Sequence, residues 1–165
     1  LETCQTMNGM WGYKIKDQNY KSSKELIRLL ARTAAKGANL LLNIGPQPNG
    51  ELPATALERL SDIGKWLNGK AGESIYATTA GGESNGDSIV TTKGKEKNAP
   101  LYIHVLTDTL PETISMHIAK KPRRATCLES GEKIGFRRNG RNNSTTFFIK
   151  NKKENNVDYI IKVEF

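Results

Sequence analysis

The stretch Asn39-Leu-Leu-Leu-Asn-Ile-Gly-Pro46 is a short apolar run that ends abruptly at Gly45-Pro46. It is much shorter than the roughly 20 apolar residues that a membrane-spanning helix needs. A run of this kind is typical of a strand that is buried on both faces, and such strands belong to parallel sheets. Because parallel sheets carry their chemistry at the carboxyl ends of their strands, we expect functional groups close to the end of this run.

A second stretch, Glu2-Thr-Cys-Gln-Thr-Met-Asn-Gly-Met-Trp-Gly-Tyr13, brings together a carboxylate, a thiol and two large aromatic rings without any helical period. We interpret residues 1–20 as a strand followed by a loop, with Glu2 at or near the C-terminal end of that strand. The chain is therefore expected to begin within an active-site strand and to be the last part of an enzyme.

Two helices are expected around the apolar run. Ser22-Ser-Lys-Glu25 has the pattern of a capping box and predicts a helix over about 23–36, which Gly37 ends in the left-handed conformation. Pro53 suits the first turn of a second helix that runs to about residue 68. Its predicted apolar face consists of Leu57, Leu60, Ile63, Gly64 and Leu67. The order strand, helix, strand, helix is typical of a parallel sheet.

From about residue 72 the pattern changes to β-rich runs separated by turn residues, with no helical pattern between them. The runs are 88–92, 101–106, 113–118, 124–128, 145–149 and 159–165. With 165 residues the chain is too short for a complete (β/α)8 barrel, which needs roughly 250. We therefore predict an α/β plus all-β fold, in which residues 1–71 form the last two strand–helix units of a partial (β/α)8-type barrel and residues 72–165 form an antiparallel β-sandwich.

The net charge of +8 suggests a nucleic-acid partner, but the distribution of the charge argues against one. The positive excess is shared by both halves of the chain. The two local clusters, Lys120–Arg124 and Arg137–Arg141, contain no interleaved aromatic residues of the kind that stack on bases. We interpret both clusters as solvated loop charge and expect neither a nucleic-acid nor a membrane partner. A polyanion binder that uses residues 120–141 remains a weaker alternative.

The cysteines and histidines give no sign of a metal site. Cys4 and Cys127 are interpreted as two free, buried thiols, although a disulfide between them remains possible. His104 and His117 each lie in an alternating β-like run and are expected to be sheet residues. We expect no metal, no cofactor and no Ser-His-Asp triad.

Four residues are candidates for functional or structural roles. Glu2 is either a carboxylate in a sugar site or an exposed terminal residue, and Trp11 either stacks on a sugar ring or covers the core. Asn43 interrupts an apolar strand, so its amide must be hydrogen-bonded and is expected to tie adjacent loops together. Trp66 is expected to anchor a helix to the sandwich. Glycoside hydrolysis needs two carboxylates, and with one candidate here the nucleophile is expected upstream of Leu1.

The same segments resemble a known family. Glu2–Tyr13 and the segments 23–30, 36–46, 49–53, 58–67 and 72–76 resemble, in that order, the end of the catalytic barrel of family 29 α-L-fucosidases. The resemblance is dense to about residue 78. The β-rich remainder is similar only in architecture to the C-terminal sandwich of the family.

This resemblance implies a retaining glycosidase with an Asp nucleophile and a carboxylic acid/base, acting on fucosylated glycans. The nucleophile segment of the family matches nothing in this chain, so the chain alone is expected to be inactive and to need the remainder of the barrel as a partner. The family motif Trp-Glu-x-Cys maps onto residues 1–4, with Leu1 in place of the Trp. Glu2 is then a possible acid/base or a supporting carboxylate, and Trp11 lines the fucose pocket.

The resemblance also implies a secreted, periplasmic or lysosomal protein. An alternative from a different class stays open at this point, namely a non-catalytic β-sandwich that binds carbohydrate or docks a partner.

Overall fold

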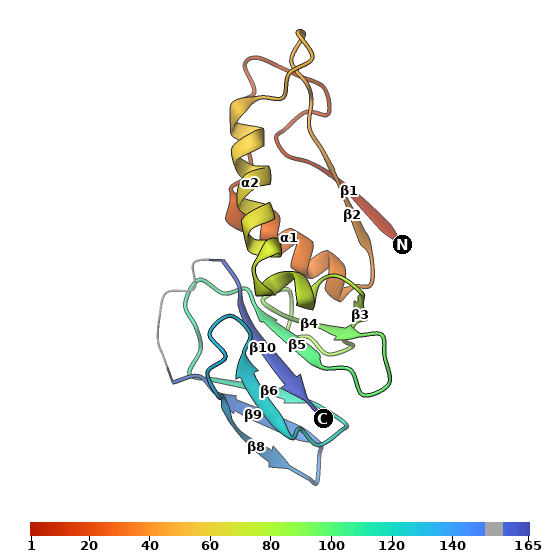
Figure 1. The fold of residues 1–165 in the computed structure, drawn as a ribbon, viewed down its shortest axis with the longest axis vertical. Coiled ribbons are helices and arrows are strands. Elements are labelled where there is room, and N and C mark those ends of the chain that lie inside the picture. Colours follow the sequence, from red (N-terminus) through yellow and green to blue (C-terminus); the bar gives the residue numbers. More distant parts are fainter. Residues whose placement is uncertain (151–156) are drawn as a thin grey trace.

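The computed structural model describes residues 1–150 and 157–165 and consists of two units (Figure 1). The first, which we call the helical unit, contains β1 (Glu2–Thr6), α1 (Ser23–Ala35), β2 (Asn39–Asn43), α2 (Ala54–Asn68) and the 3-10 helix η1 (Lys70–Ser74). The second, the two-sheet unit, contains all the remaining strands. None of the helices in the described part of the chain is both long and apolar enough to cross a bilayer.

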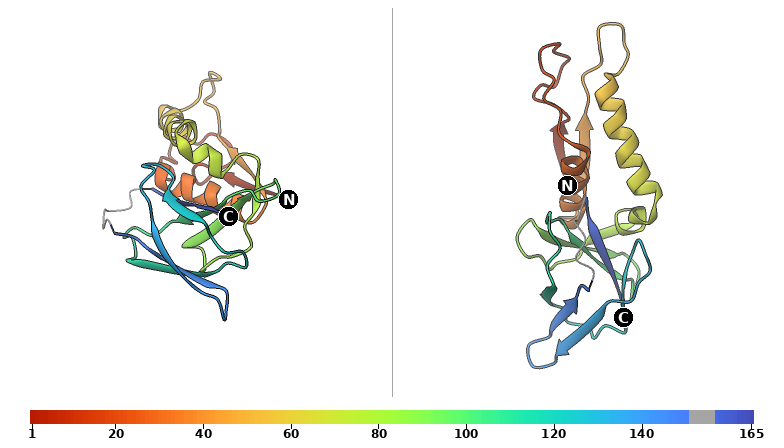
Figure 2. Two further views of the ribbon diagram at one scale, coloured as in Figure 1. Left: turned by 60° about the horizontal axis from the view of Figure 1, so that its bottom comes forward. Right: turned by 90° about the vertical axis from the view of Figure 1, so that its left-hand side faces the viewer.

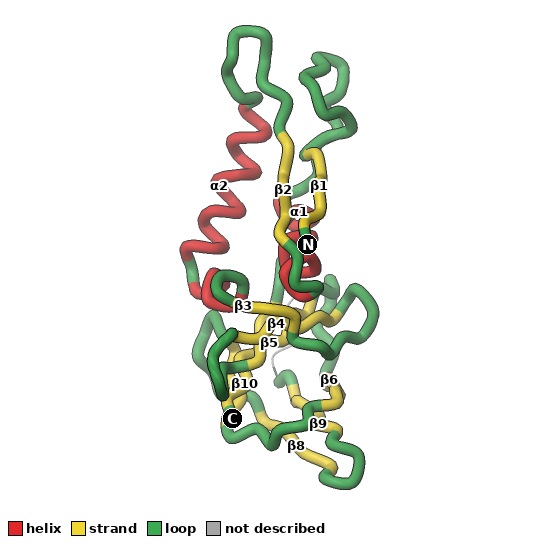
Figure 3. Tube along the Cα trace, turned by 90° about the vertical axis from the view of Figure 1, so that its right-hand side faces the viewer, coloured by secondary structure: helices red, strands yellow, loops and turns green. Residues whose placement is uncertain are grey.

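In the helical unit, β1 and β2 pair in parallel, as the order of elements predicts. Glu2 lies opposite Asn39 and Thr6 lies opposite Asn43. Helix α1 connects the two strands and packs against β2 and α2. Seen from the side of the strands, both helices lie behind or beside the pair and leave its front uncovered (Figure 3).

The expectation that the Asn39–Ile44 run is buried on both faces is wrong. Leu42 packs under the helices with Met7 and Leu26, but its neighbour Leu41 is 43% exposed. Cys4, which pairs with Leu41 in the register of the strands, is exposed too, so the prediction of a buried thiol there fails. The reason is that successive side chains of a strand point to opposite faces, and no other element in the described residues covers the second face of this pair.

Helix α1 begins and ends as its sequence predicts. The Ser22 side chain accepts a hydrogen bond from the backbone N–H of Glu25, and the Glu25 carboxylate accepts one from the backbone N–H of Ser22. This capping box satisfies two N–H groups that the first turn of a helix leaves free. The hydrogen bonds that the Glu25 carboxylate accepts from the backbone N–H and from the hydroxyl of Ser22 lower the pKa of this carboxyl. Gly37 takes a φ of +69° at the other end, where L-residues with a side chain are strained.

The predicted apolar face of α2 is only partly correct. Ala56 is fully buried and Ile63 packs against the same cluster as Leu26, whereas Leu57 and Leu60 are 51% and 38% exposed. Ala56 and Ile63 lie on the side of α2 that packs in one cluster with Leu26 of α1. The two leucines therefore lie on a flank of the helix that no described element covers.

The two-sheet unit consists of two antiparallel sheets, with strand orders β3-β4-β5-β10-β7 and β6-β9-β8. Its strands are β3 (Thr78–Ala80), β4 (Ile89–Gly94), β5 (Leu101–Val105), β6 (Thr113–His117), β7 (Arg124–Cys127), β8 (Gly135–Asn139), β9 (Ser144–Phe148) and β10 (Tyr159–Glu164). All six predicted β-rich runs contain strands, but β3 and β8 were not predicted. Over 78–150 and 157–165 the structure contains no α-helix.

The middle of the five-stranded sheet is buried on both of its faces. Its inner face shares a core with the three-stranded sheet, in which Ile103 and Ile161 pack with Phe147. On its outer face, one cluster joins Val90 to α1, and another places Trp66 of α2 against Tyr102, Leu128 and Ile160. This double coverage explains why all five residues of β5 are buried. It also confirms the prediction that Trp66 anchors the helix to the sheets.

His104 belongs to the polar part of this junction and is a sheet residue, as predicted. Its Nδ1 lies 2.7 Å from Asp158 Oδ2, and its Nε2 lies 3.2 Å from the Thr92 hydroxyl, with all three side chains buried. Thr92 in turn donates to the carbonyl of Ser74 in η1 at 2.6 Å. These contacts tie η1 to β4, to β5 and to Asp158, which directly precedes β10. His117 lies on β6, as predicted.

Glu73 of η1 makes a second polar link across the junction. Its carboxylate accepts hydrogen bonds from the Tyr102 hydroxyl at 2.7 Å and from the Lys162 ammonium. Burial tends to raise the pKa of Glu73, but the hydrogen bonds from Lys162 and Tyr102 and the charge of Lys162 outweigh burial, so the pKa lies below its usual value of 4.5. The ionised form of Glu73 therefore stabilises the fold.

We expect Glu73→Gln to lower the free energy of unfolding at neutral pH by up to about 1 kcal/mol, because the group is partly exposed and its ion pair is screened. Since a lowered pKa stabilises only the ionised form, the contribution is present above the usual pKa of 4.5 and is lost as the pH falls through the lowered value. Urea unfolding of both proteins between neutral pH and about pH 3 measures the difference. Glu96→Gln in an exposed turn is the matched control. A difference that stays constant down to the acid limit would contradict this role.

Candidate functional site

The carboxyl ends of β1 and β2 lie side by side, and long loops leave both of them. Residues 7–22 follow β1 and residues 44–53 follow β2, and the two loops project together from one end of the molecule (Figures 1 and 2). In a parallel sheet this end is the one at which binding and catalytic groups gather. It is therefore the candidate site.

Asn43 holds the first of these loops in place. Its side-chain Nδ2 donates to the backbone carbonyl of Trp11 at 2.7 Å and to the Thr6 hydroxyl at 3.3 Å. The Thr6 hydroxyl itself donates to the carbonyl of Met10 at 2.9 Å. The prediction that the Asn43 amide ties adjacent loops together is confirmed. Thr6 is a second member of this clamp that the sequence did not reveal.

The two loops also touch through backbone that has no room for a side chain. A Cβ atom on Gly45 would lie only 2.6 Å from the carbonyl carbon of Gly12 and from the backbone nitrogen of Tyr13. Further along, the Asp17 carboxylate accepts a hydrogen bond from the backbone N–H of Gly9 at 3.0 Å. The loop that carries Trp11 is thus held at three places: by Asn43 and Thr6, by the close contact at Gly45, and by Asp17.

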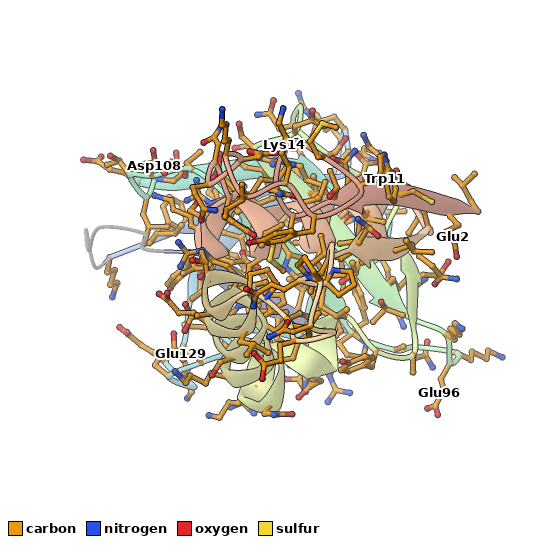
Figure 4. All side chains as sticks on the ribbon, turned by 90° about the horizontal axis from the view of Figure 1, so that it is seen from above. Glu2, Trp11, Lys14, Glu96, Asp108 and Glu129 are labelled. Atoms are coloured by element: carbon orange, nitrogen blue, oxygen red, sulfur yellow. The ribbon has the colours of Figure 1, made fainter. Side chains whose placement is uncertain are left out.

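Trp11 itself is 55% exposed, so the alternative in which it covers the core is wrong. Figure 4 shows it on the side of the molecule that β1 and its loop form. An exposed indole on a tethered loop offers a flat apolar surface with little conformational entropy to lose on binding. Such a surface is suited to contact with the apolar face of a sugar ring.

The predicted position of Glu2 needs correction. Glu2 is the first residue of β1 and not its last, because the strand continues through Cys4 to Thr6 and pairs with the whole of β2. Glu2 therefore lies about 13 Å from the carboxyl end of the strand at Thr6, at a rise of roughly 3.3 Å per residue. Its carboxylate lies 4.0 Å from the Cys4 sulfur on the uncovered face of the pair.

The arrangement supplies binding groups but no pair of reacting carboxylates. Glu2 lies at the other end of β1 from Thr6, whereas the backbone of Trp11 is held at Asn43, the partner of Thr6. The Asp17 carboxylate is engaged with the backbone N–H groups of Gly9 and Asn19. In the described residues, no group of three or more His, Cys, Asp or Glu side chains could hold a metal ion. Neither the hydrogen bonds of Asn43 and Thr6 nor the contact at Gly45 produces a repeating pattern in the sequence. The amide of Asn43 within an apolar run was the single feature of the sequence that pointed to them.

The contact at Gly45 leads to a prediction about stability. Gly45→Ala should lower the free energy of unfolding by about 2 kcal/mol or more, because backbone atoms of the neighbouring loop cannot yield cheaply to the new methyl group. Gly64→Ala is the matched control, since nothing lies within 4 Å of the added methyl on helix α2. This change should stabilise the protein by about 0.5–1 kcal/mol. Urea unfolding measures both changes, and equal effects would argue against close contact between the loops.

Comparison with known proteins places these observations in a family. A family model described as alpha-L-fucosidase matches residues 1–73. The plasma alpha-L-fucosidase of Homo sapiens is 37% identical over 103 residues, which are 58% of this chain and 22% of the human protein. An alpha-L-fucosidase of Dictyostelium discoideum is 33% identical over 137 residues, or 80% of this chain and 30% of that protein. The chain thus spans between about a fifth and a third of the length of these relatives.

Solved structures agree over nearly the whole chain. Alpha-L-fucosidase isoenzyme 1 from Paenibacillus thiaminolyticus superposes with a TM-score of 0.84 at 27% identity, covering 99% of this chain and 39% of that one. A GH29 alpha-L-fucosidase from Bacteroides thetaiotaomicron gives a TM-score of 0.84 at 28% identity, covering 99% of this chain and 37% of that one. The mostly-sheet fold with few helices is therefore a fold found in fucosidases. By family model, curated relatives and solved structures alike, this chain is related to the α-L-fucosidases of glycoside hydrolase family 29.

Proposed function

We propose that this chain is the C-terminal portion of a retaining α-L-fucosidase, which hydrolyses terminal α-L-fucosyl linkages in glycans. Residues 1–71 would be the last two strand–helix units of a (β/α)8-type barrel, and residues 72–165 a C-terminal β-sandwich. The observation that carries the proposal is the parallel β1–β2 pair, which has helices on one face only and a tethered indole at its carboxyl end. The family match over residues 1–73 covers the same segment.

The surfaces left open on the helical unit support the remainder of the barrel as a partner. Cys4 and Leu41 are exposed on the face of the pair opposite the helices, where a closed barrel would have its interior. Leu57 and Leu60 are exposed on the flank of α2, where a further barrel helix would pack. Large apolar side chains grouped in this way are typical of surfaces that another part of a protein covers.

Trp11 is the residue that we propose to contact the substrate. Fucose has an apolar methyl group and an apolar ring face, and the exposed indole can pack against either of them. The clamp formed by Asn43 and Thr6 acts on the backbone of the loop and leaves the indole free. Its contribution is to hold the ring in one place before the sugar arrives, which reduces the entropy lost on binding.

Glu2 has the weaker case for a catalytic role. We infer that it is a supporting carboxylate inside the barrel, because it lies well before the carboxyl end of β1 at Thr6, whereas the acid/base of a barrel enzyme must reach the carboxyl ends of the strands. The acid/base would then come from outside this chain. As an acid/base, Glu2 would have to act about 13 Å from the end of its strand.

The chemistry that we propose is a double displacement through a covalent fucosyl-enzyme. The Bacteroides thetaiotaomicron enzyme was captured as a covalent intermediate with 2-fluoro-fucosyl fluoride in a glutamate-to-glutamine variant. In this scheme an Asp attacks the anomeric carbon, a carboxylic acid protonates the departing oxygen, and water then releases fucose. Since neither reacting carboxylate is placed within the described site, the isolated chain should be inactive.

The test uses an aryl α-L-fucoside with the isolated chain, with a longer protein that contains it, and with Trp11 variants of the longer protein. The longer protein should release product, and the 165-residue chain should release none. Trp11→Ala should lower kcat/KM about 10- to 100-fold, because it removes roughly 1.4–2.7 kcal/mol of sugar contact. Trp11→Phe should retain most of the activity. Trp66→Phe, at the junction of the units, is the control and should leave kcat/KM unchanged.

Two outcomes would overturn the proposal. Turnover by the isolated chain would show that the nucleophile lies within it. An inactive longer protein, combined with saturable fucose binding by residues 72–165 alone, would favour the alternative of a non-catalytic carbohydrate-binding module.

A further inference from the structure

A cleft of about 550 Å³ lies at the open edge of the two-sheet unit, where the two sheets part. On one side it is bounded by β7, which is the last strand of the five-stranded sheet, and on the other by β8, the last strand of the three-stranded sheet. The residues that line it are Arg123, Arg124, Ala125, Lys133, Ile134 and Phe136. This edge is at the opposite end of the molecule from the Trp11 loop (Figure 1).

The floor of the cleft is apolar and held in place. Ile134 is buried and donates its backbone N–H to the carbonyl of Ala125 at 2.9 Å, which fixes the segment between the sheets along the edge of β7. Phe136 packs against Phe147 of the shared core, with ring centroids 6.0 Å apart. A ligand would therefore meet a preformed surface and not one that must first become ordered.

The rim carries three exposed cations, those of Arg123, Arg124 and Lys133. In the described part of the chain, Glu164 is the only acid that forms an ion pair with any of them. It lies 3.8 Å from Arg124, and both side chains are about half exposed, so the pair is weak. The lining of the cleft accordingly carries three cations and no acid.

The structure also changes the interpretation of the two basic clusters as solvated loop charge. Arg124 belongs to β7, and Arg137 and Arg138 belong to β8. Arg138 donates to the backbone carbonyls of Ile118 and Ala119 at 2.8 and 2.9 Å, which binds the segment leading into the first cluster to the strand that carries the second. Two clusters that are separate in sequence therefore flank one edge.

We propose that this cleft binds an acidic saccharide, that is, a sugar ring that carries a sulfate ester or a carboxylate. Its volume is within the range of about 300–1,000 Å³ typical of small-molecule sites. The forked guanidinium groups of Arg123 and Arg124 match the paired oxygens of such an anion, and the apolar floor accepts the ring. The choice of a saccharide as the ligand rests on the proposed function, because the cleft would then be a second glycan-binding site of a glycosidase.

Nucleic acid fits the cleft less well, because single strands are held chiefly by bases that stack on exposed aromatic rings. Among the described residues of the two-sheet unit, Phe148 is the only large apolar residue that is exposed, and it does not line the cleft. A phosphate backbone would find cations here, but the one aromatic ring in the lining, Phe136, is partly buried and packs against Phe147.

Titration of the 165-residue chain with labelled disaccharides tests the proposal. One probe carries a sulfate ester, the second a uronic carboxylate and the third no charge. The charged probes should bind saturably, and binding should weaken steeply as the ionic strength rises from about 0.01 M to about 1 M. The neutral probe should bind at least about tenfold more weakly. Comparison of the two charged probes shows which oxyanion the cleft prefers.

Paired variants locate the binding. Arg123→Gln/Lys133→Gln should weaken binding of the charged probes at least about tenfold, because two charge-assisted hydrogen bonds are lost. Lys36→Gln/Lys65→Gln is the matched control; it removes the same charge from two exposed residues of the helical unit and should leave affinity unchanged. Glu164→Gln, which frees Arg124, should strengthen binding. Melting temperatures within a few degrees of the unaltered chain confirm that each variant is folded.

The proposal is overturned if no charged probe binds, if both double variants weaken binding equally, or if a single-stranded oligonucleotide binds more tightly than either disaccharide. Because binding is measured on the chain without any hydrolysis, its failure is distinguishable from failure of the proposed fucosidase activity.

Discussion

β1 and β2 run parallel, and this pairing brings the ends of both strands and the loops that leave them to one end of the helical unit. The consequences reach every part of the site. Asn43 can grip the backbone of Trp11 only because Thr6 and Asn43 are partners in the register. Gly45 meets Gly12 for the same reason. An antiparallel pair would send the two loops to opposite ends, and the indole would lose its clamp.

The helical unit is held on the two-sheet unit by a mostly apolar junction with a polar centre. Trp66 packs against Tyr102, whose hydroxyl donates to Glu73, while His104 and Thr92 connect the same sheet to the end of η1. The outer face of the five-stranded sheet would otherwise be an exposed apolar surface. The two-sheet unit therefore braces the strands that carry the site, and it leaves its own far edge free for the basic cleft.

Local signals allowed much of this fold to be predicted from the sequence. The capping box at Ser22, the turn at Gly37 and the alternating runs of the β-rich half each act within a few residues, so their outcomes are visible in the sequence. Exposure of Leu41, Cys4 and Leu57 was not predictable, because burial depends on which other elements cover a face. The sequence predicted that the Asn43 amide would join adjacent loops. It did not predict that Trp11 would be the partner, because the loop of Trp11 has no repeating sequence pattern. The basic cleft was missed because β8 itself was missed.

The most direct test of the central idea is the reactivity of Cys4, which lies on the face that we propose to be the interior of a barrel. In the 165-residue chain, Cys4 should react readily with a thiol reagent, while buried Cys127 serves as an internal standard for slow reaction. In a longer protein that contains the chain, Cys4 should react at least about tenfold more slowly, because neighbouring strands would cover it. Equal reactivity of Cys4 in both proteins would contradict the account.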